Sequence, residues 1–212
     1  MKKRILAMLF ALTLAFSAAG CGGKDTEEQP TEQDQQQEQQ DTENQYDPRE
    51  GASEEALGML DYLEGLPAEI PQEDAAADGF FTIADGAVVS GQEKWDAFME
   101  AVNAGEEASV VVCQYSMHGG AVLDYVLHRA DGGFEVVSDT TRDGYERENG
   151  IYERVQKFEA LKVFEDFSLQ EGGDSYQICV LSDEADLDED TFRTYWTEMS
   201  TEAHHTYLLF VI

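Results

Sequence analysis

An arginine lies between two aspartates at a point where a predicted strand ends. Asp139, Arg142 and Asp143 fall within the run Asp139-Thr140-Thr141-Arg142-Asp143. The guanidinium of Arg142 can pair with either carboxylate, or it can bind an anion beside them. The simpler interpretation is a salt bridge that fixes a loop. We keep both interpretations and expect any ligand-binding site of the domain near these three residues.

Alternating carboxylates extend from Asp186 to Asp190, as in a calcium-binding loop. The sixth position of such a loop needs a glycine for its sharp turn, and here it is Thr191. The twelfth position, normally a bidentate glutamate, is Thr197. Acidic residues also suit the positive end of a helix dipole. We therefore interpret the run as the start of a helix and predict no metal site.

The histidines do not complete a catalytic set in the sequence. His118-Gly119-Gly120 resembles the oxyanion turn of esterases, but the Gly-x-Ser-x-Gly elbow that would supply a nucleophile is absent, so we predict a hairpin turn here. His204 and His205 are adjacent, and adjacent side chains on a strand point to opposite faces. The sequence therefore predicts neither catalytic residues nor a cofactor. The alternative is a cell-envelope hydrolase whose residues converge only in the folded chain.

Two cysteines, Cys113 and Cys179, lie inside apolar runs that are expected to form strands. They can be small buried thiols, or they can pair in a disulfide if their strands are neighbours in register. A disulfide that closes so long a loop would contribute about 4 kcal/mol. The sequence leaves the pairing open, and we favour two buried thiols.

The third cysteine, Cys21, ends an apolar leader. Met1–Arg4 is cationic and Ile5–Phe16 is almost wholly apolar, as in a secretory signal peptide, so we predict that residues 1–20 are removed. The apolar run is shorter than the ~20 residues that a spanning helix needs. The tetrad Ala18-Ala19-Gly20-Cys21 resembles the lipobox of bacterial lipoproteins. This resemblance implies a diacylglyceryl lipid on Cys21, with acyl chains such as palmitate, and a stable membrane anchor.

The chain is strongly acidic, with 13 Lys and Arg against 45 Asp and Glu and a formal net charge of −32. The leader holds three of the basic residues and no acidic one, so the remainder carries −35. This charge repels nucleic acid and anionic lipid head groups. We therefore exclude nucleic acid as a partner and expect only the covalent lipid to attach the chain to the membrane. A protein or small ligand at the cell surface is the expected partner.

Residues 21–77 are predicted to form an acidic, glutamine-rich, disordered tether that carries the lipid. Gly22–Asp47 contains almost no apolar residue, so it cannot bury enough surface to offset the entropy of ordering. Within the tether, Ser53 can cap a short helix near residues 54–64, which Gly65 would end. A helix this short is marginal by itself.

The next helix has strong signals at both ends. Ser90-Gly91-Gln92-Glu93 has the pattern of a capping box, and Gly105 can supply a left-handed exit. An apolar stripe follows the box at helical spacing, and we interpret it as core rather than as a ligand site. The stripe consists of Trp95, Phe98, Met99 and Val102.

Residues 78–212 are predicted to form an α+β domain, an antiparallel sheet of about five to six strands with one or two helices packed on one face. Leu123, Tyr125 and Leu127 alternate with Asp124 and His128, which predicts a strand with one buried and one wet face. A second helix is expected from Asp188 or Asp190 to Met199. Strands are expected at Ser109–Met117, Ala121–Arg129, Phe134–Thr140, Tyr152–Leu169 (one long strand or two joined by a bulge), Ser175–Leu181 and Thr206–Ile212.

The segment from about Gly86 to Leu181 is similar to the small exported-lipoprotein family catalogued as domain-of-unknown-function family 4362. The shared motifs are Trp95-Asp96-Ala97-Phe98 on the helix, Tyr115-Ser116 at a strand end, and the run from Asp139 to Asp143. The order of elements and the lipidated leader also agree. The resemblance implies a fold and a location, but no activity.

These observations together predict a monomeric, lipid-anchored protein on the extracytoplasmic side of the cell membrane. Its domain is expected to be a non-catalytic binding module or a structural module of the envelope.

Overall fold

A computed structural model describes residues 49, 51–115, 120–144, 153–170 and 173–212 of the chain. The chain divides into two units, Met1–Gln45 and Tyr46–Ile212, and every described residue belongs to the second. The described elements are, in chain order, α2 (Glu54–Glu64), α3 (Gln72–Ala77), β1 (Phe81–Ala84), β2 (Ala87–Ser90), α4 (Gln92–Ala104), β3 (Ala108–Tyr115), β4 (Ala121–His128), β5 (Phe134–Asp139), β6 (Glu153–Phe158), β7 (Ala160–Phe167), β8 (Tyr176–Ser182), α6 (Glu189–Thr197) and β9 (Thr206–Val211).

The described strands form two sheets rather than the single antiparallel sheet that we predicted. The large sheet has the order β2-β1-β3-β4-β5-β6, and the small sheet has the order β7-β8-β9. All neighbours are antiparallel except β1 and β3, which run parallel. The parallel pair arises because β2 and α4 carry the chain back before β3 begins. The α+β class is confirmed. The large sheet is mixed rather than purely antiparallel, because it contains the parallel pair of β1 and β3.

The predicted long strand Tyr152–Leu169 is two strands that belong to different sheets. β6 is the edge strand of the large sheet, and β7 is the edge strand of the small sheet. Glu159 separates them, and its backbone N–H donates to the carbonyl of Ser182 at the end of β8. The chain therefore changes its pairing partner at Glu159 and passes from one sheet to the other.

The capping box predicted for α4 is not formed. Ser90 is the last residue of β2, and Gly91 in the left-handed conformation (φ +75°) is the N-cap without a side-chain hydrogen bond. A Cβ on Gly91 would lie 2.2 Å from the carbonyl oxygen of Phe80, so the close approach of β1 requires a glycine here. At the other end of α4, Gly105 (φ +70°) provides the predicted left-handed exit.

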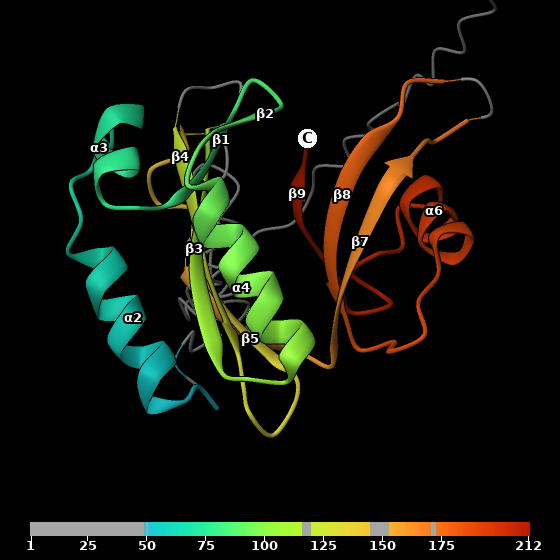
Figure 1. The fold of residues 1–212 in the computed structure, drawn as a ribbon, viewed down its shortest axis with the longest axis horizontal. Helices are drawn as coiled ribbons and strands as arrows, with labels where there is room; N and C mark the ends of the chain where they lie inside the picture. Colours follow the sequence, from blue (N-terminus) through green and yellow to red (C-terminus); the bar gives the residue numbers. More distant parts are fainter. Residues whose placement is uncertain (1–48, 50, 116–119, 145–152, 171–172) are drawn as a thin grey trace, which may run out of the picture. The chain divides into compact units, whose positions relative to one another are not determined.

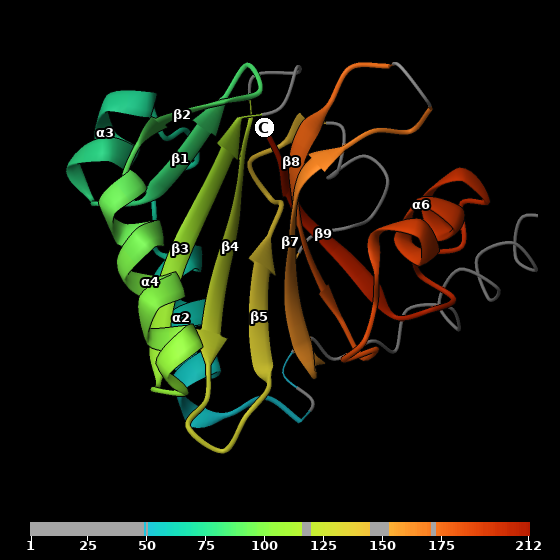
Figure 2. The ribbon, with the colours of Figure 1, turned by 45° about the vertical axis from the view of Figure 1, so that its right-hand side comes forward.

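Helices cover both faces of the large sheet, not one face as predicted (Figures 1 and 2). α2 and α3 pack on one face, where Leu60 and Leu63 are fully buried. α4 packs on the opposite face, where its side chains share a core with the small sheet. α6 packs on the other face of the small sheet through Phe192. The small sheet is therefore buried on both of its faces.

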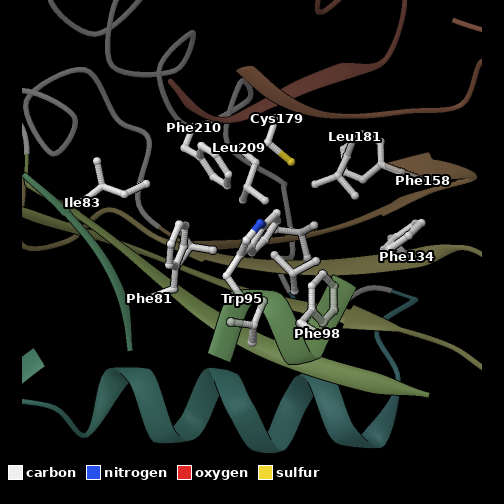
Figure 3. Packing of buried hydrophobic residues seen from close by; sticks show 14 residues of the cluster. Phe81, Ile83, Trp95, Phe98, Phe134, Phe158, Cys179, Leu181, Leu209 and Phe210 are labelled. Carbon is white, nitrogen blue, oxygen red and sulfur yellow. The ribbon is translucent and has the colours of Figure 1, made fainter. Parts of the chain in front are cut away.

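The core between the two sheets is built around three aromatic rings (Figure 3). Trp95 of α4 stacks on Phe81 of β1, with their ring centroids 5.2 Å apart. Both rings meet the edge of Phe210 from β9, at 5.0 and 5.4 Å. Phe98 lies next to Trp95 on the same helix. The interpretation of the α4 stripe as core is confirmed.

The segment that contains α2 and α3 belongs to the folded unit, which corrects the predicted boundary at residues 77 and 78. The predicted helix is present at Glu54–Glu64, and the Ser53 hydroxyl accepts the N–H of Ala56 as its cap. The backbone N–H of Ser53 donates to the Glu135 carboxylate of β5 at 2.9 Å. α2 is thus held by side chains of the sheet, and this tertiary packing supplies what a short helix lacks alone.

Candidate functional site

Arg142 connects the large sheet to the end of α2. Its Nη1 pairs with the fully buried carboxylate of Asp139 and also lies 3.5 Å from the Thr141 hydroxyl. Its Nη2 donates to the carbonyls of Leu63 and Leu66, at 2.7 and 3.1 Å, and its Nε donates to the carbonyl of Pro67 at 2.8 Å. Leu63 lies in the last turn of α2, where its carbonyl also accepts the N–H of Leu66 at 3.1 Å, and Leu66 and Pro67 follow directly after the helix. Arg142 therefore acts as a cap for α2.

This geometry leaves the guanidinium of Arg142 without a donor for a bound anion. A guanidinium has five N–H donors, and each of them has an acceptor among the groups named above. Asp139 and Asp143 are both buried. A pocket of about 470 Å³ does lie beside Arg142, next to Tyr115 and Gly144. The assignment of Asp139, Arg142 and Asp143 as a ligand site stays a prediction, and the contacts of Arg142 favour a structural role.

A second polar cluster lies between the two sheets. The hydroxyl of Tyr207 on β9 donates to Asp124 Oδ1 on β4 at 2.7 Å, and Ser138 Oγ on β5 lies 3.2 Å from the same hydroxyl. The guanidinium of Arg154 on β6 lies over the Tyr207 ring, 5.4 Å from its centroid. Three buried atoms of the cluster have no hydrogen-bond partner within the described part of the chain: Asp124 Oδ2, Arg154 Nε and Gln156 Oε1.

Burial raises the pKa of Asp124 from 3.8 to about 6, and the hydrogen bond from Tyr207 opposes this increase. Burial also raises the pKa of Tyr207 well above its ordinary value, and the neighbouring carboxylate adds to the effect. The wet face predicted for β4 is wrong, because Asp124 and His128 are only 1% and 7% exposed. The small sheet, formed much later in the chain, covers Asp124, while the His128 Nδ1 is 2.7 Å from the carbonyl oxygen of Glu106.

A groove of about 480 Å³ opens between α2 and α4, at the start of β3. Val110 and Val111 both line it, although successive side chains of a strand point to opposite faces. The groove therefore lies along the edge of β3 rather than over one face. Met59 and Tyr62 of α2 line one side, and the other side is lined by residues of α4 that include Ala97 and Phe98. Figure 1 shows the start of β3 between these two helices.

No local pattern of the sequence marks this groove. It exists because β1 starts its pairing with β3 only at Phe81 and Val112, so the residues Ala108 to Val111 extend beyond β1. The edge is a product of unequal strand lengths and of the two helices beside it. Sequence reasoning therefore missed the groove, just as it missed the polar cluster.

The two cysteines of the domain are free and buried. Cys113 faces α2 and α3, whereas Cys179 belongs to the core between the sheets, so the large sheet separates them. Burial raises the pKa of the Cys113 thiol to about 11 and that of Cys179 well above its ordinary value. The interpretation as two buried thiols is confirmed, and both are poor nucleophiles.

The acidic run before α6 is a helix start, as predicted. The carboxylate of Asp188 accepts the N–H of Thr191 at 2.8 Å, which lowers the pKa of Asp188. His205 Nδ1 lies 2.6 Å from Asp183, and His204 stacks on Tyr195 with their centroids 3.7 Å apart. Among the described residues, no three His, Cys, Asp or Glu side chains gather as metal ligands would.

Two of the predicted features lie outside the described residues. They are the lipidation site Cys21, with the leader before it and the tether to residue 47 after it, and the turn that contains His118. No helix in the described ranges is long and apolar enough to cross a bilayer.

No family model matches the chain, and no curated protein or solved structure matches it. The similarity to bacterial lipoproteins and to family 4362 stays a prediction. Only this chain's own residues and their arrangement therefore bear on its function.

Proposed function

We propose that the protein is a lipid-anchored, extracytoplasmic binding module without catalytic activity. The groove between α2 and α4 carries this proposal. It is an open concave surface with both apolar and polar lining, and Ala97 and Ser109 at its margin are exposed. Surfaces of this kind hold partners or ligands. The leader and the Cys21 tetrad support the location, and the acidic composition supports attachment by lipid rather than by charge.

The alternative of an envelope hydrolase has less support in the fold. Among the described residues, Asp124 has a carboxyl group whose pKa is raised toward neutrality, but this residue is 1% exposed and lies between the sheets. Asp124 lines neither the pocket beside Arg142 nor the groove between α2 and α4. A catalytic carboxyl must lie within hydrogen-bond reach of its substrate. We therefore treat Asp124 as a residue of the interior and propose that the protein acts through its surface.

Replacing Cys21 with alanine tests the location. We expect the variant to leave the membrane fraction and to appear in the medium or as uncleaved precursor, because the sulfur that carries the lipid is gone. Fractionation of cells followed by immunoblotting measures this change. Cys113→Ala is the matched control and should keep the membrane location, since Cys113 is buried in the domain. A Cys21→Ala protein that stays in the membrane at the original level contradicts the anchor.

Crosslinking on intact cells tests the binding role. We expect a defined surface partner to be captured through the lysine at position 94, which lines the groove. If crosslinkers placed at the groove capture nothing while other surface positions capture a partner, the groove is not the functional surface.

A further inference from the structure

The start of β3 presents an unpaired strand edge to the groove. β3 pairs with β4 along its whole length, from Ala108 to Tyr115. On its other side it pairs with β1 only from Val112 to Gln114. Within the described residues, no strand pairs with that side of Ala108–Val111. In an antiparallel pair, alternate residues direct their N–H and C=O groups away from the partner strand. Residues 108–111 therefore offer backbone donors and acceptors to whatever enters the groove.

The two helices beside this edge define the side chains that an added strand would need. α2 lies against one face of the large sheet and α4 against the other. Successive residues of an added strand would point alternately toward Met59 and Tyr62 and toward Ala97 and Phe98. A strand on a half-exposed sheet would alternate apolar and polar residues, but here both faces are covered. The matching segment is therefore a short run of consecutive apolar residues.

The charges around the groove favour a basic partner. Asp78 lines the groove, and Glu55 accepts a hydrogen bond of 2.7 Å from Tyr125, another lining residue. Burial raises the pKa of Tyr125 to about 12, and the nearby charges of Glu55 and Glu107 add to the increase. Lys94 is the cationic residue of the lining. The whole chain has a formal net charge of −32, so its long-range electrostatic potential is negative, as the carboxylates near the groove are. Both would attract a basic partner.

We propose that this groove binds an extended peptide segment of a partner protein by strand addition to β3, and that the segment has an apolar centre with Lys or Arg on its flanks. Backbone hydrogen bonds to Ala108–Val111 supply the affinity, and the walls of α2 and α4 supply the selectivity. This inference rests on the proposed binding function and specifies the chemistry of the partner.

A labelled peptide of the sequence Lys-Lys-Val-Ile-Val-Val-Lys-Lys tests the binding mode on the purified full chain. We expect saturable binding in fluorescence anisotropy that weakens as salt screens the flanking charges. Two N-methylated versions of this peptide, methylated at alternate positions in opposite phase, separate backbone pairing from side-chain contact. Strand addition predicts that one phase loses about tenfold or more in affinity, because its methyl groups replace the N–H donors that face β3, while the other phase binds normally.

Substitutions on α4 place the peptide in the groove. Ala97 is exposed and lines the groove, whereas Ala104 is exposed on the same helix and does not line it. We expect Ala97→Arg to lower the affinity for the peptide by about tenfold or more, since the arginine adds both bulk and positive charge. We expect Ala104→Arg to leave this affinity unchanged. Hydrogen exchange should show new protection within residues 108–111 of the unsubstituted chain when the peptide is bound.

Three results would each overturn strand addition. The two N-methylated peptides could lose affinity equally, or Ala97→Arg and Ala104→Arg could have equal effects on peptide affinity. The third is the absence of saturable binding up to about 1 mM peptide. If the peptide fails while intact-cell crosslinking still captures a surface partner, the inference of strand addition is wrong and the binding role stands. If Cys21→Ala stays anchored, the proposed function fails irrespective of the peptide.

Discussion

Replacing Arg142 with alanine is expected to lower the free energy of unfolding by about 3–5 kcal/mol, the cost of removing one partner of a buried ion pair. The side chains of Arg142 and Asp139 are 5% and 0% exposed, so the ion pair is shielded from bulk water in the folded chain. Among the described residues, the carboxylate of Asp139 would keep its hydrogen bonds from Thr141. The carbonyls of Leu63, Leu66 and Pro67 would lose the donors that Arg142 supplies, and the carbonyl of Leu63 would keep the N–H of Leu66.

Urea unfolding followed by tryptophan fluorescence measures this loss, and limited proteolysis shows whether α2 detaches first. Arg49→Ala is the matched control, because Arg49 also contacts α2 but pairs with Asp61 and Glu64 on the exposed surface. Exposed ion pairs contribute little, so this control should leave the unfolding midpoint nearly unchanged. Equal small effects of the two substitutions would show that Arg142 is not a structural clamp and would revive its assignment to a ligand site.

Replacing Asp124 with asparagine is expected to change the pH dependence of stability. The pKa of Asp124 is about 6 in the folded chain, against 3.8 for an unburied aspartate. Well below pH 3.8 the carboxyl is protonated in both states. Between pH 4 and pH 6 the unfolded state ionises first, so stability falls as pH rises, and above pH 6 the full penalty of about 3 kcal/mol is present. Asparagine does not ionise, so its stability advantage over aspartate should grow by about 2 kcal/mol from pH 4 to pH 7.

Unfolding curves of Asp124→Asn and of the original chain across this pH range measure the change. A second variant, Tyr207→Phe, removes the hydrogen bond that opposes the pKa increase. We expect the fall in stability to start at the same pH, set by the unfolded state, but to continue to a higher pH, because the pKa of Asp124 in the folded state rises further. If the two proteins keep a constant difference in stability from pH 4 to pH 7, Asp124 is not a buried carboxyl with a raised pKa.

Elements with local signals could be predicted from the sequence. The hydroxyl of Ser53 caps the start of α2, and the backbone N–H of Gly65 donates to a carbonyl of the last turn at its end. The carboxylate of Asp188 caps the start of α6. The strands β3, β4 and β5 were predicted to within about two residues, because Gly-rich turns separate runs of β-branched residues. Such signals depend on neighbours in the sequence, so no tertiary information is needed to read them.

Features that depend on distant segments could not be predicted. Asp124 alternates with apolar residues, which indicates a solvent face, but Tyr207 from the last strand reaches it across the core. Ser90 has the pattern of a cap, yet pairing with Thr82 makes it the end of a strand. The edge of β3 that forms the groove depends on where β1 stops pairing with it. In each case the deciding contact joins residues that no local pattern connects.

Mass spectrometry of the protein purified from membranes tests the central claim most directly. The account predicts that the N-terminal peptide begins at Cys21 and carries a diacylglyceryl group on its sulfur. An N-terminal peptide with an unmodified Cys21, or one that retains the leader, would contradict it.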